Sequence, residues 1–178
     1  MGLLKAVGAA LRAGFTVEGF DPRKPCVVTY CFDGDTVKVT QGDYEERVRL
    51  IGIDAPEIGW HGKEEDLWAP ESREFLRGLV QDQVVELRLD GDKYDKYDRL
   101  LAYVYRESDD LFVNAEMIGQ GWAWSYEYFP FSQKWHFRQC QWQARAARRG
   151  IWQHEPESLL VIVGRWLAGL FGKRDAAP

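Results

Sequence analysis

Three short segments with β-strand character follow one another in the first third of the chain. Residues 26–32 form a run of β-branched and aromatic side chains, residues 36–40 alternate apolar with polar side chains, and the alternation resumes over residues 45–53. Asp33-Gly34 interrupts the first pair, and Gln41-Gly42-Asp43 interrupts the second, with residues typical of tight turns. The sequence therefore predicts a β-hairpin extended by a third strand, which ends at Asp54.

The rest of the chain alternates predicted helices with two further strands. Strands are predicted over residues 83–90 and 100–105, and helices from Pro70, over residues 113–120, and over residues 134–149. Gly121 and Gly150 stand where the last two helices are expected to end. Five short strands with a helix between the third and the fourth fit a small Greek-key barrel. The expected fold class is α+β, mainly β: a five-stranded OB-fold barrel with about three helices. The first of these helices is expected to bury the side chains of Phe75, Leu76, Leu79 and Val80.

Size, charge and cysteine content exclude several classes of protein. With 178 residues the chain is long enough for one domain with a good core. A net charge of −5 argues against a protein that coats nucleic acid without sequence preference, although it leaves room for a local basic site. Cys26, Cys31 and Cys140 have no spacing typical of a zinc site, so we expect buried free thiols.

Charged side chains gather at the predicted ends of the first three strands. Asp33 and Asp35 flank the first turn, Arg49 lies in the third strand, and Asp54 ends it. Pairing of these strands would bring three carboxylates and a guanidinium to one point. Such a group is typical of a site that binds a metal ion and a phosphate.

Three motifs in register resemble the staphylococcal nuclease (thermonuclease) family. They are DGDTVK at residues 33–38, RLIGIDAPE at residues 49–57 and DKYDRLLAYVY at residues 95–105, and residues 143–152 are similar to the carboxy-terminal helix of that family. The resemblance covers residues 27–152. It implies an OB-type barrel and a calcium-dependent phosphodiesterase that cuts DNA and RNA to products with a 3′-phosphate.

The resemblance also implies a set of site residues. It makes Asp35, Asp54 and the backbone carbonyl of Ala55 the ligands of Ca²⁺, with another divalent ion left open, and it puts Asp33 in the outer shell. Glu57 is implied as the general base that takes a proton from the attacking water. Further roles are a phosphate clamp made by Arg49 and Arg99, a site for the terminal phosphate at Lys96 and Tyr97, and base stacking by Tyr126 and Tyr128, which align with the family only after a shift of one residue.

The chemistry of phosphodiester hydrolysis is consistent with these residue types. The reaction builds negative charge on the phosphate oxygens, so it needs fixed cations and a base close to the water. Arginine suits the clamp because its planar guanidinium stays charged and can bind two oxygens at once. Two positions depart from the family pattern: Ala55 stands where many members have Thr, and Asp98 stands where Gly is common.

Other interpretations of the same residues stay open at this point. Asp33 and Asp35 could have a purely structural role, in which they shape a hairpin turn. Arg49 could pair with Glu45 or Glu57 on the strand surface. Trp122 could pack in the core or contact bases. The whole domain could also be a catalytically weak OB-fold module that binds single-stranded nucleic acid or a protein partner.

The two ends lie outside the family resemblance. We expect a short extension over residues 1–25, the nuclease-like domain over residues 26–153 and an amphipathic extension over residues 154–178. The last segment is too short and too charged for a membrane span, so weak contact with a membrane surface or with protein is expected for it. We expect a monomer, with DNA or RNA as substrate. The amino terminus makes a poor signal peptide, which favours a cytoplasmic protein and leaves a secreted or membrane-associated one open.

Overall fold

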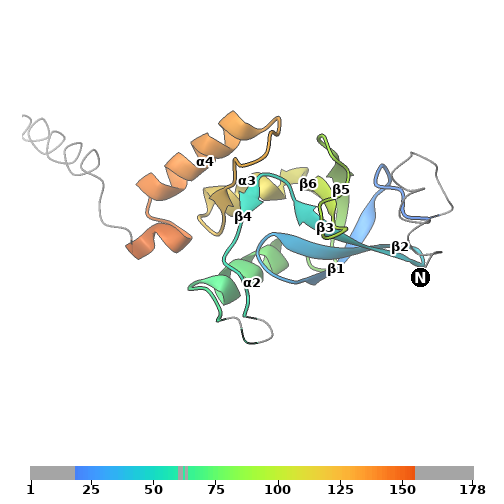
Figure 1. The fold of residues 1–178 in the computed structure, drawn as a ribbon, viewed down its shortest axis with the longest axis horizontal. Helices are drawn as coiled ribbons and strands as arrows, with labels where there is room; N and C mark the ends of the chain where they lie inside the picture. The colour runs from blue at the N-terminus through green and yellow to red at the C-terminus, as the bar shows by residue number, and fades with distance from the viewer. Residues whose placement is uncertain (1–18, 60–61, 63, 155–178) are drawn as a thin grey trace, which may run out of the picture.

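A closed barrel of five strands forms the centre of the protein (Figure 1). The computed structural model describes residues 19–59, 62 and 64–154. The barrel strands are β1 (Cys26–Cys31), β2 (Thr36–Gln41), β3 (Tyr44–Leu50), β5 (Val84–Arg88) and β6 (Leu100–Arg106). They are hydrogen-bonded in the order β3-β2-β1-β5-β6, and a parallel pairing between β3 and β6 closes the barrel. The expected α+β class and OB-type barrel are confirmed.

The barrel strands bury one side chain in two, as their sequence alternation predicts. Val37 and Val39 of β2 and Val48 and Leu50 of β3 are at most 1% exposed, whereas the residues between them face outward or are half-buried. The register pairs Thr36 with Arg49 and Lys38 with Arg47. Polar side chains of these two strands therefore share the outer face of the barrel.

In the described part of the chain, three helices pack around this barrel. They are α2 (Ala69–Val80), α3 (Val113–Gly119) and α4 (Lys134–Ala146), and a 3₁₀ turn, η1 (Gly150–His154), follows the last one. Pro70 stands in the first turn of α2, where its missing N–H costs nothing. Leu76 and Val80 are fully buried and Phe75 and Leu79 pack against the core, which confirms the predicted buried face of this helix.

The predicted third strand, residues 45–53, is wrong in one respect: it breaks after Leu50. Gly52 adopts a positive φ of 73°, and the chain then forms the separate two-residue strand β4 (Ile53–Asp54). This strand pairs with β8 (Trp124–Ser125) rather than with the barrel. A side chain at Gly52 would also lie within 3.0 Å of the rings of Phe131 and Phe137. The pairing of β4 with β8 causes this break, and the alternation pattern of the sequence does not reveal that pairing.

Two further differences concern short elements. The strand β7 (Leu111–Phe112) extends the sheet beside β6. Neither β7 nor β8 was predicted, because a strand of two residues is too short to show an alternation of apolar and polar side chains. The helix predicted over residues 134–149 ends at Ala146. It ends early because the N–H of Ile151 bonds the carbonyl of Gly121, at 2.8 Å, and the chain must unwind to reach it.

The three cysteines are free, as expected. Cys26 and Cys31 are buried as predicted, whereas Cys140 is only half-buried. Within the described ranges, no helix has the length and apolar character needed to cross a membrane. Residues 155–178 of the predicted amphipathic extension, and residues 1–18, lie outside the ranges that the structure describes.

Candidate active site

Asp35 is the most buried charged residue of the site and lies just before β2. Its side chain is 2% exposed, and its carboxylate accepts hydrogen bonds from the Ala55 N–H and the Thr36 hydroxyl, both at 2.9 Å. Burial raises the pKa of Asp35, and the neighbouring charge of Arg49 opposes that effect. A carboxylate removed from water in this way needs positive charge beside it.

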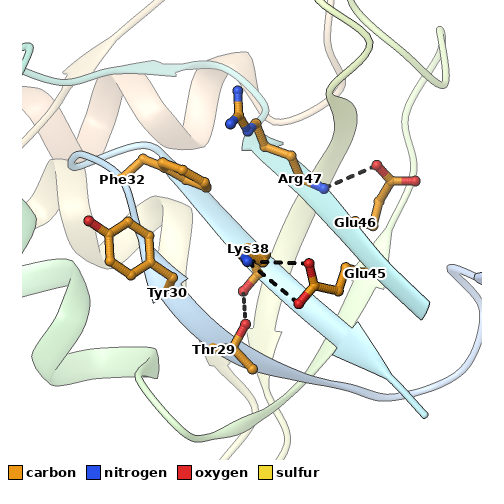
Figure 2. A pocket seen from close by; sticks show the side chains of 7 residues that line it. All are labelled: Thr29, Tyr30, Phe32, Lys38, Glu45, Glu46 and Arg47. Atoms are coloured by element: carbon orange, nitrogen blue, oxygen red, sulfur yellow. Dashed lines mark hydrogen bonds and ion pairs between the residues drawn. The ribbon is translucent and has the colours of Figure 1, made fainter. Parts of the chain in front are cut away.

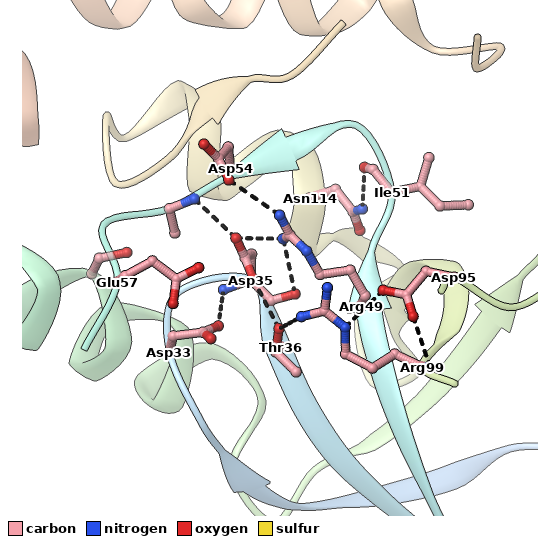
Figure 3. Close-up of polar contacts among 12 residues, drawn as sticks. Asp33, Asp35, Thr36, Arg49, Ile51, Asp54, Glu57, Asp95, Arg99 and Asn114 are labelled. Atoms are coloured by element: carbon pink, nitrogen blue, oxygen red, sulfur yellow. Dashed lines mark hydrogen bonds and ion pairs between the residues drawn. The ribbon is translucent and has the colours of Figure 1, made fainter. Parts of the chain in front are cut away.

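Arg49 bridges two of the predicted metal ligands (Figure 3). Its guanidinium forms an ion pair with Asp35 and a second one with Asp54, in which Nη2 and Oδ1 are 3.2 Å apart. The Arg49 side chain is only 14% exposed, so these pairs are shielded from solvent more than a surface salt bridge is. The alternative in which Arg49 pairs with Glu45 or Glu57 is wrong, because these pairs with Asp35 and Asp54 take its guanidinium inward.

Asp54 reaches the site because the third strand breaks before it. It lies in β4, which is antiparallel to β8 and pairs Asp54 with Trp124. Its side chain is 45% exposed, in contrast to the buried Asp35. The next residue, Ala55, is tied to Asp35 through its N–H. The role predicted for the Ala55 carbonyl as a metal ligand stays a prediction.

Arg99 approaches the same point from the start of β6. Its Nη1 donates to Thr36 Oγ1 at 3.2 Å, and Thr36 is the residue that pairs with Arg49 across β2 and β3. Asp95 holds Arg99 in place: its Oδ2 accepts from Arg99 Nε at 2.8 Å, and its Oδ1 accepts from the Arg99 N–H at 3.0 Å. The structure therefore brings both predicted clamp arginines to Thr36.

Sequence reasoning gave no role to Asp95 or Thr36, although both lie inside the quoted motifs. Burial raises the pKa of Asp95, but the hydrogen bonds from Arg99 outweigh that effect and leave the pKa lowered. Asp95 is thus a charged partner for Arg99. The spacing of four residues between Asp95 and Arg99 was a usable indication of this pair.

The turn that carries Asp33 is held tightly against helix α2. Asp33 Oδ1 accepts the N–H of Asp35 at 2.9 Å, so Asp33 shapes the turn as the alternative interpretation proposed. A Cβ at Gly34 would collide with Ser72 Oγ and lie 2.7 Å from Ala55 Cβ. Only glycine fits between the turn, the helix and Ala55. The outer-shell role of Asp33 stays a prediction.

Glu57 lies on the exposed rim of the site. Its N–H donates to Asp66 Oδ2 at 3.0 Å, and its carbonyl accepts the Asp66 N–H at the same distance. These two bonds fix the backbone of Glu57 while its side chain remains exposed. Figure 3 shows the carboxylate pointing toward the turn that holds Asp33 and Asp35. Such a position is open to water, as a general base requires.

Lys96 and Tyr97 are exposed next to Arg99. The Tyr97 side chain is 66% exposed, and the Lys96 ammonium and the Arg99 guanidinium lie 4.8 and 5.4 Å from the centre of its ring. The two cations therefore stand beside one exposed aromatic ring. This grouping is consistent with the predicted binding of a terminal phosphate.

The predicted stacking tyrosines follow β8. The N–H of Tyr126 donates to the Gly52 carbonyl at 2.8 Å, which ties it to the segment before Asp54. The rings of Tyr126 and Tyr128 lie 6.3 Å apart, nearly parallel, and Tyr128 is 79% exposed. Trp122, in contrast, packs against Phe75 with ring centres 6.1 Å apart, so it belongs to the core and not to a surface that contacts bases.

The carboxylates of Asp35 and Asp54 are the hard oxygen donors that Ca²⁺ prefers. Arg49 supplies one positive charge beside the two carboxyl groups, so a cation would find a site that is not already balanced when both are ionised. In the ranges that the structure describes, no group of three or more His, Cys, Asp and Glu side chains could hold a metal ion. The donor set fits a divalent cation whose remaining ligands come from backbone oxygens, water or substrate.

Several known proteins are similar to this chain in sequence. Residues 47–154, more than half of the chain, match the sequence profile of a family described as staphylococcal nuclease homologues. An uncharacterized endonuclease of Haemophilus influenzae is 34% identical over 131 residues, which are 73% of this chain and 67% of that protein. A thermonuclease of Staphylococcus intermedius is 31% identical, over 71% of this chain and 75% of its own. A micrococcal nuclease of Shigella flexneri is 30% identical over 84% of each chain. On this match and these identities, the chain belongs to the staphylococcal nuclease family.

Proposed function

We propose that this protein is a calcium-dependent nuclease that hydrolyses phosphodiester bonds in DNA or RNA. The observation that carries the proposal is the convergence of Arg49 and Arg99 on Thr36, beside the carboxylates of Asp35 and Asp54. Two buried or half-buried guanidiniums at one point form a site for a dianionic or trigonal-bipyramidal phosphate. The names of the nuclease relatives support the same reaction.

Each arginine keeps donors for a substrate. A guanidinium carries five N–H groups, and the contacts of Arg49 with Asp35 and Asp54 and of Arg99 with Asp95 and Thr36 use only some of them. In the proposed reaction both arginines bind oxygens of the scissile phosphate and stabilise the negative charge that grows on them. Asp95 keeps Arg99 oriented, and the bridge to Asp35 and Asp54 does the same for Arg49.

The proposed reaction is attack of water on phosphorus. Glu57 takes a proton from the water as the new P–O bond forms, and the bond between phosphorus and the 5′-oxygen breaks, which leaves a 3′-phosphate and a 5′-hydroxyl that takes up a proton. Asp35 and Asp54, with the Ala55 carbonyl, would hold the calcium ion, and Asp33 would stand in the outer shell. When bound, the ion would supply Lewis-acid stabilisation of the phosphate oxygens. Lys96 and Tyr97 would bind a neighbouring phosphate, and Tyr126 and Tyr128 would contact bases.

A cleavage assay with purified protein tests this function. Labelled single-stranded and duplex DNA and RNA are incubated with calcium, with other divalent ions and with a chelator, and the product ends are mapped. We expect cleavage that needs calcium, and loss of Arg49, as in Arg49→Ala, is expected to lower kcat by on the order of 10³-fold. Glu57→Gln should lower kcat while leaving substrate affinity largely intact.

Arg88→Ala is the matched control. Arg88 is an exposed arginine of β5 that pairs with Glu86 and Asp110, and its replacement should leave the rate unchanged. Wild-type rates in the Arg49→Ala variant would contradict the proposed clamp. Binding of single strands without turnover under any divalent ion would instead favour a noncatalytic OB-fold module.

A further inference from the structure

A hollow of about 740 Å³ lies on the outer face of β1, β2 and β3, outside the candidate active site (Figure 2). None of the predicted site residues lines it. It is lined by aromatic and charged side chains, which include Tyr30, Phe32, Lys38, Glu45, Glu46 and Arg47.

Residues that line the hollow are neighbours, along β2 and β3, of residues in the candidate active site. Arg47 stands two residues before Arg49 on β3, and Lys38 stands two residues after Thr36 on β2; the register pairs Arg49 with Thr36 and Arg47 with Lys38. Side chains two residues apart share one face of a strand, about 7 Å from each other. Arg47 and Lys38 therefore form the cross-strand pair next to Arg49 and Thr36. The spacing between the two pairs is comparable to the length of one nucleotide in an extended single strand of nucleic acid.

Aromatic rings and guanidiniums alternate in this hollow. The Arg47 guanidinium lies 4.3 Å over the ring of Phe32, and the rings of Phe32 and Tyr30 meet edge to face at 5.0 Å. Arg73 of α2 donates to the Tyr30 hydroxyl at 3.1 Å, and Tyr30 is 43% exposed. Rings and guanidinium planes of this kind stack on nucleobases, and their cations bind the adjacent phosphates.

The two ends of the hollow differ in charge. Among the described residues no carboxylate pairs with the Arg47 guanidinium, so its charge is available to a ligand. Glu45 and Glu46 lie farther from Arg49 along β3 than Arg47 does. Glu45 pairs with Lys38 at 3.3 Å, and Glu46 accepts from the Tyr94 hydroxyl at 3.2 Å. These carboxylates would repel a phosphate. The attractive part of the hollow is thus confined to the end that adjoins Arg49, which is enough for one or two nucleotides.

We propose that Tyr30, Phe32 and Arg47 form a binding subsite for a nucleotide that neighbours the scissile phosphate in a single-stranded substrate. Tyr30 stacks on its base, and Arg47 binds its outer phosphate while Phe32 supports the guanidinium. The subsite rests on the proposed nuclease function for its place in catalysis. It predicts a preference for single strands, because a base within a duplex cannot leave its stack at no cost.

Two substrates of different length test the subsite. One is a single-stranded oligonucleotide of 12 residues, and the other is a nitrophenyl phosphodiester of thymidine, which is too short to reach Tyr30. We expect Arg47→Ala and Tyr30→Ala each to lower the ratio of kcat/KM for the oligonucleotide to kcat/KM for the small diester about tenfold, the loss expected for one stacking or phosphate contact. Tyr30→Phe keeps the ring and should keep most of the ratio.

Arg88→Ala is again the matched control, since its guanidinium also lies over an aromatic ring, that of Tyr105 at 3.7 Å, but outside the hollow. An unchanged ratio in both Arg47→Ala and Tyr30→Ala would overturn the subsite. Binding of the labelled oligonucleotide in the presence of chelator separates this result from failure of the nuclease proposal. If the wild-type protein binds but does not cleave, weaker binding by both variants supports the subsite, and equal binding overturns it.

Discussion

At the scale of single residues, close approach of backbone and side chain decides the geometry of the candidate site. Gly34 lies between Asp33 and Asp35, where Ser72 of α2 and Ala55 leave no room for a Cβ. The Ser72 hydroxyl is itself fixed by a bond of 2.7 Å to the carbonyl of Trp122. The turn before β2 therefore cannot move away from Ala55 or α2 without a loss of packing.

Replacement of this glycine tests that packing. Gly34→Ala is expected to lower the free energy of unfolding by about 1–3 kcal/mol, the usual cost of overpacking, as measured by urea denaturation. Gly78→Ala is the matched control, because Gly78 lies in α2 with no atom within 4 Å of the added Cβ. That control should raise stability by up to about 1 kcal/mol through helix propensity. Equal stabilities of the two variants would contradict the close approach at Gly34.

At the scale of elements, a buried amide joins three segments that lie far apart in the sequence. Asn114 of α3 is 0% exposed; its Oδ1 accepts the Val104 N–H from β6, and its Nδ2 donates to the Ile51 carbonyl, both at 2.9 Å. Figure 3 shows the second bond, between Asn114 and Ile51, to the upper right, above the Arg49 side chain. Asn114 thus fixes the point at which the chain leaves β3 and turns toward Asp54.

Loss of this amide should destabilise the protein and disturb β4. Asn114→Ala leaves a buried N–H and a buried carbonyl without partners, so we expect the free energy of unfolding to fall by about 2–4 kcal/mol, measured in urea. Gln120→Ala removes a partly exposed amide that donates to Glu116 and to no other side chain in the described part of the chain, and it should change stability by less than about 0.5 kcal/mol. A fully stable Asn114→Ala variant would show that the break after Leu50 does not depend on this residue.

At the scale of the whole molecule, burial keeps several weak acids protonated. Burial raises the pKa of Cys26 and Cys31 to about 12, and burial together with acidic neighbours raises the pKa of Tyr94 and Tyr103 to about 12. In an unfolded chain thiols ionise near pH 8.5 and phenols near pH 10. The folded state therefore holds protons that the unfolded state has already lost.

This difference predicts an alkaline limit to stability. A raised pKa in the folded state gives stability that is fully present below the unfolded pKa and is lost as the pH rises through the folded one. The urea midpoint is expected to be flat near pH 7–8 and to fall steadily from about pH 8.5 toward pH 12. Replacement of Cys26 and Cys31 by Ala should remove the part of this fall that begins below about pH 10. A midpoint in the wild-type protein that does not change between about pH 8 and 11 would contradict the prediction.

The sequence by itself determined the elements and the family. A run of β-branched and aromatic side chains located β1, and alternation at period two located β2, β5 and β6, because a half-buried strand requires that alternation wherever it stands. The spacing of three motifs was sufficient to identify the family and to name Asp35, Arg49 and Arg99 as residues of one site. Their catalytic roles stay predictions, as does calcium.

Only the tertiary structure decided how these residues meet. The break after Leu50, the bridge from Arg49 to Asp35 and Asp54, and the contact of Arg99 with Thr36 all join segments through barrel closure or packing against α3. A local sequence pattern indicates which face of a strand is buried, because successive side chains of a strand point to opposite faces. The local pattern does not indicate which backbone groups will pair with side chains that are distant in the sequence. The hydrogen bond from Asn114 to the Ile51 carbonyl is an example.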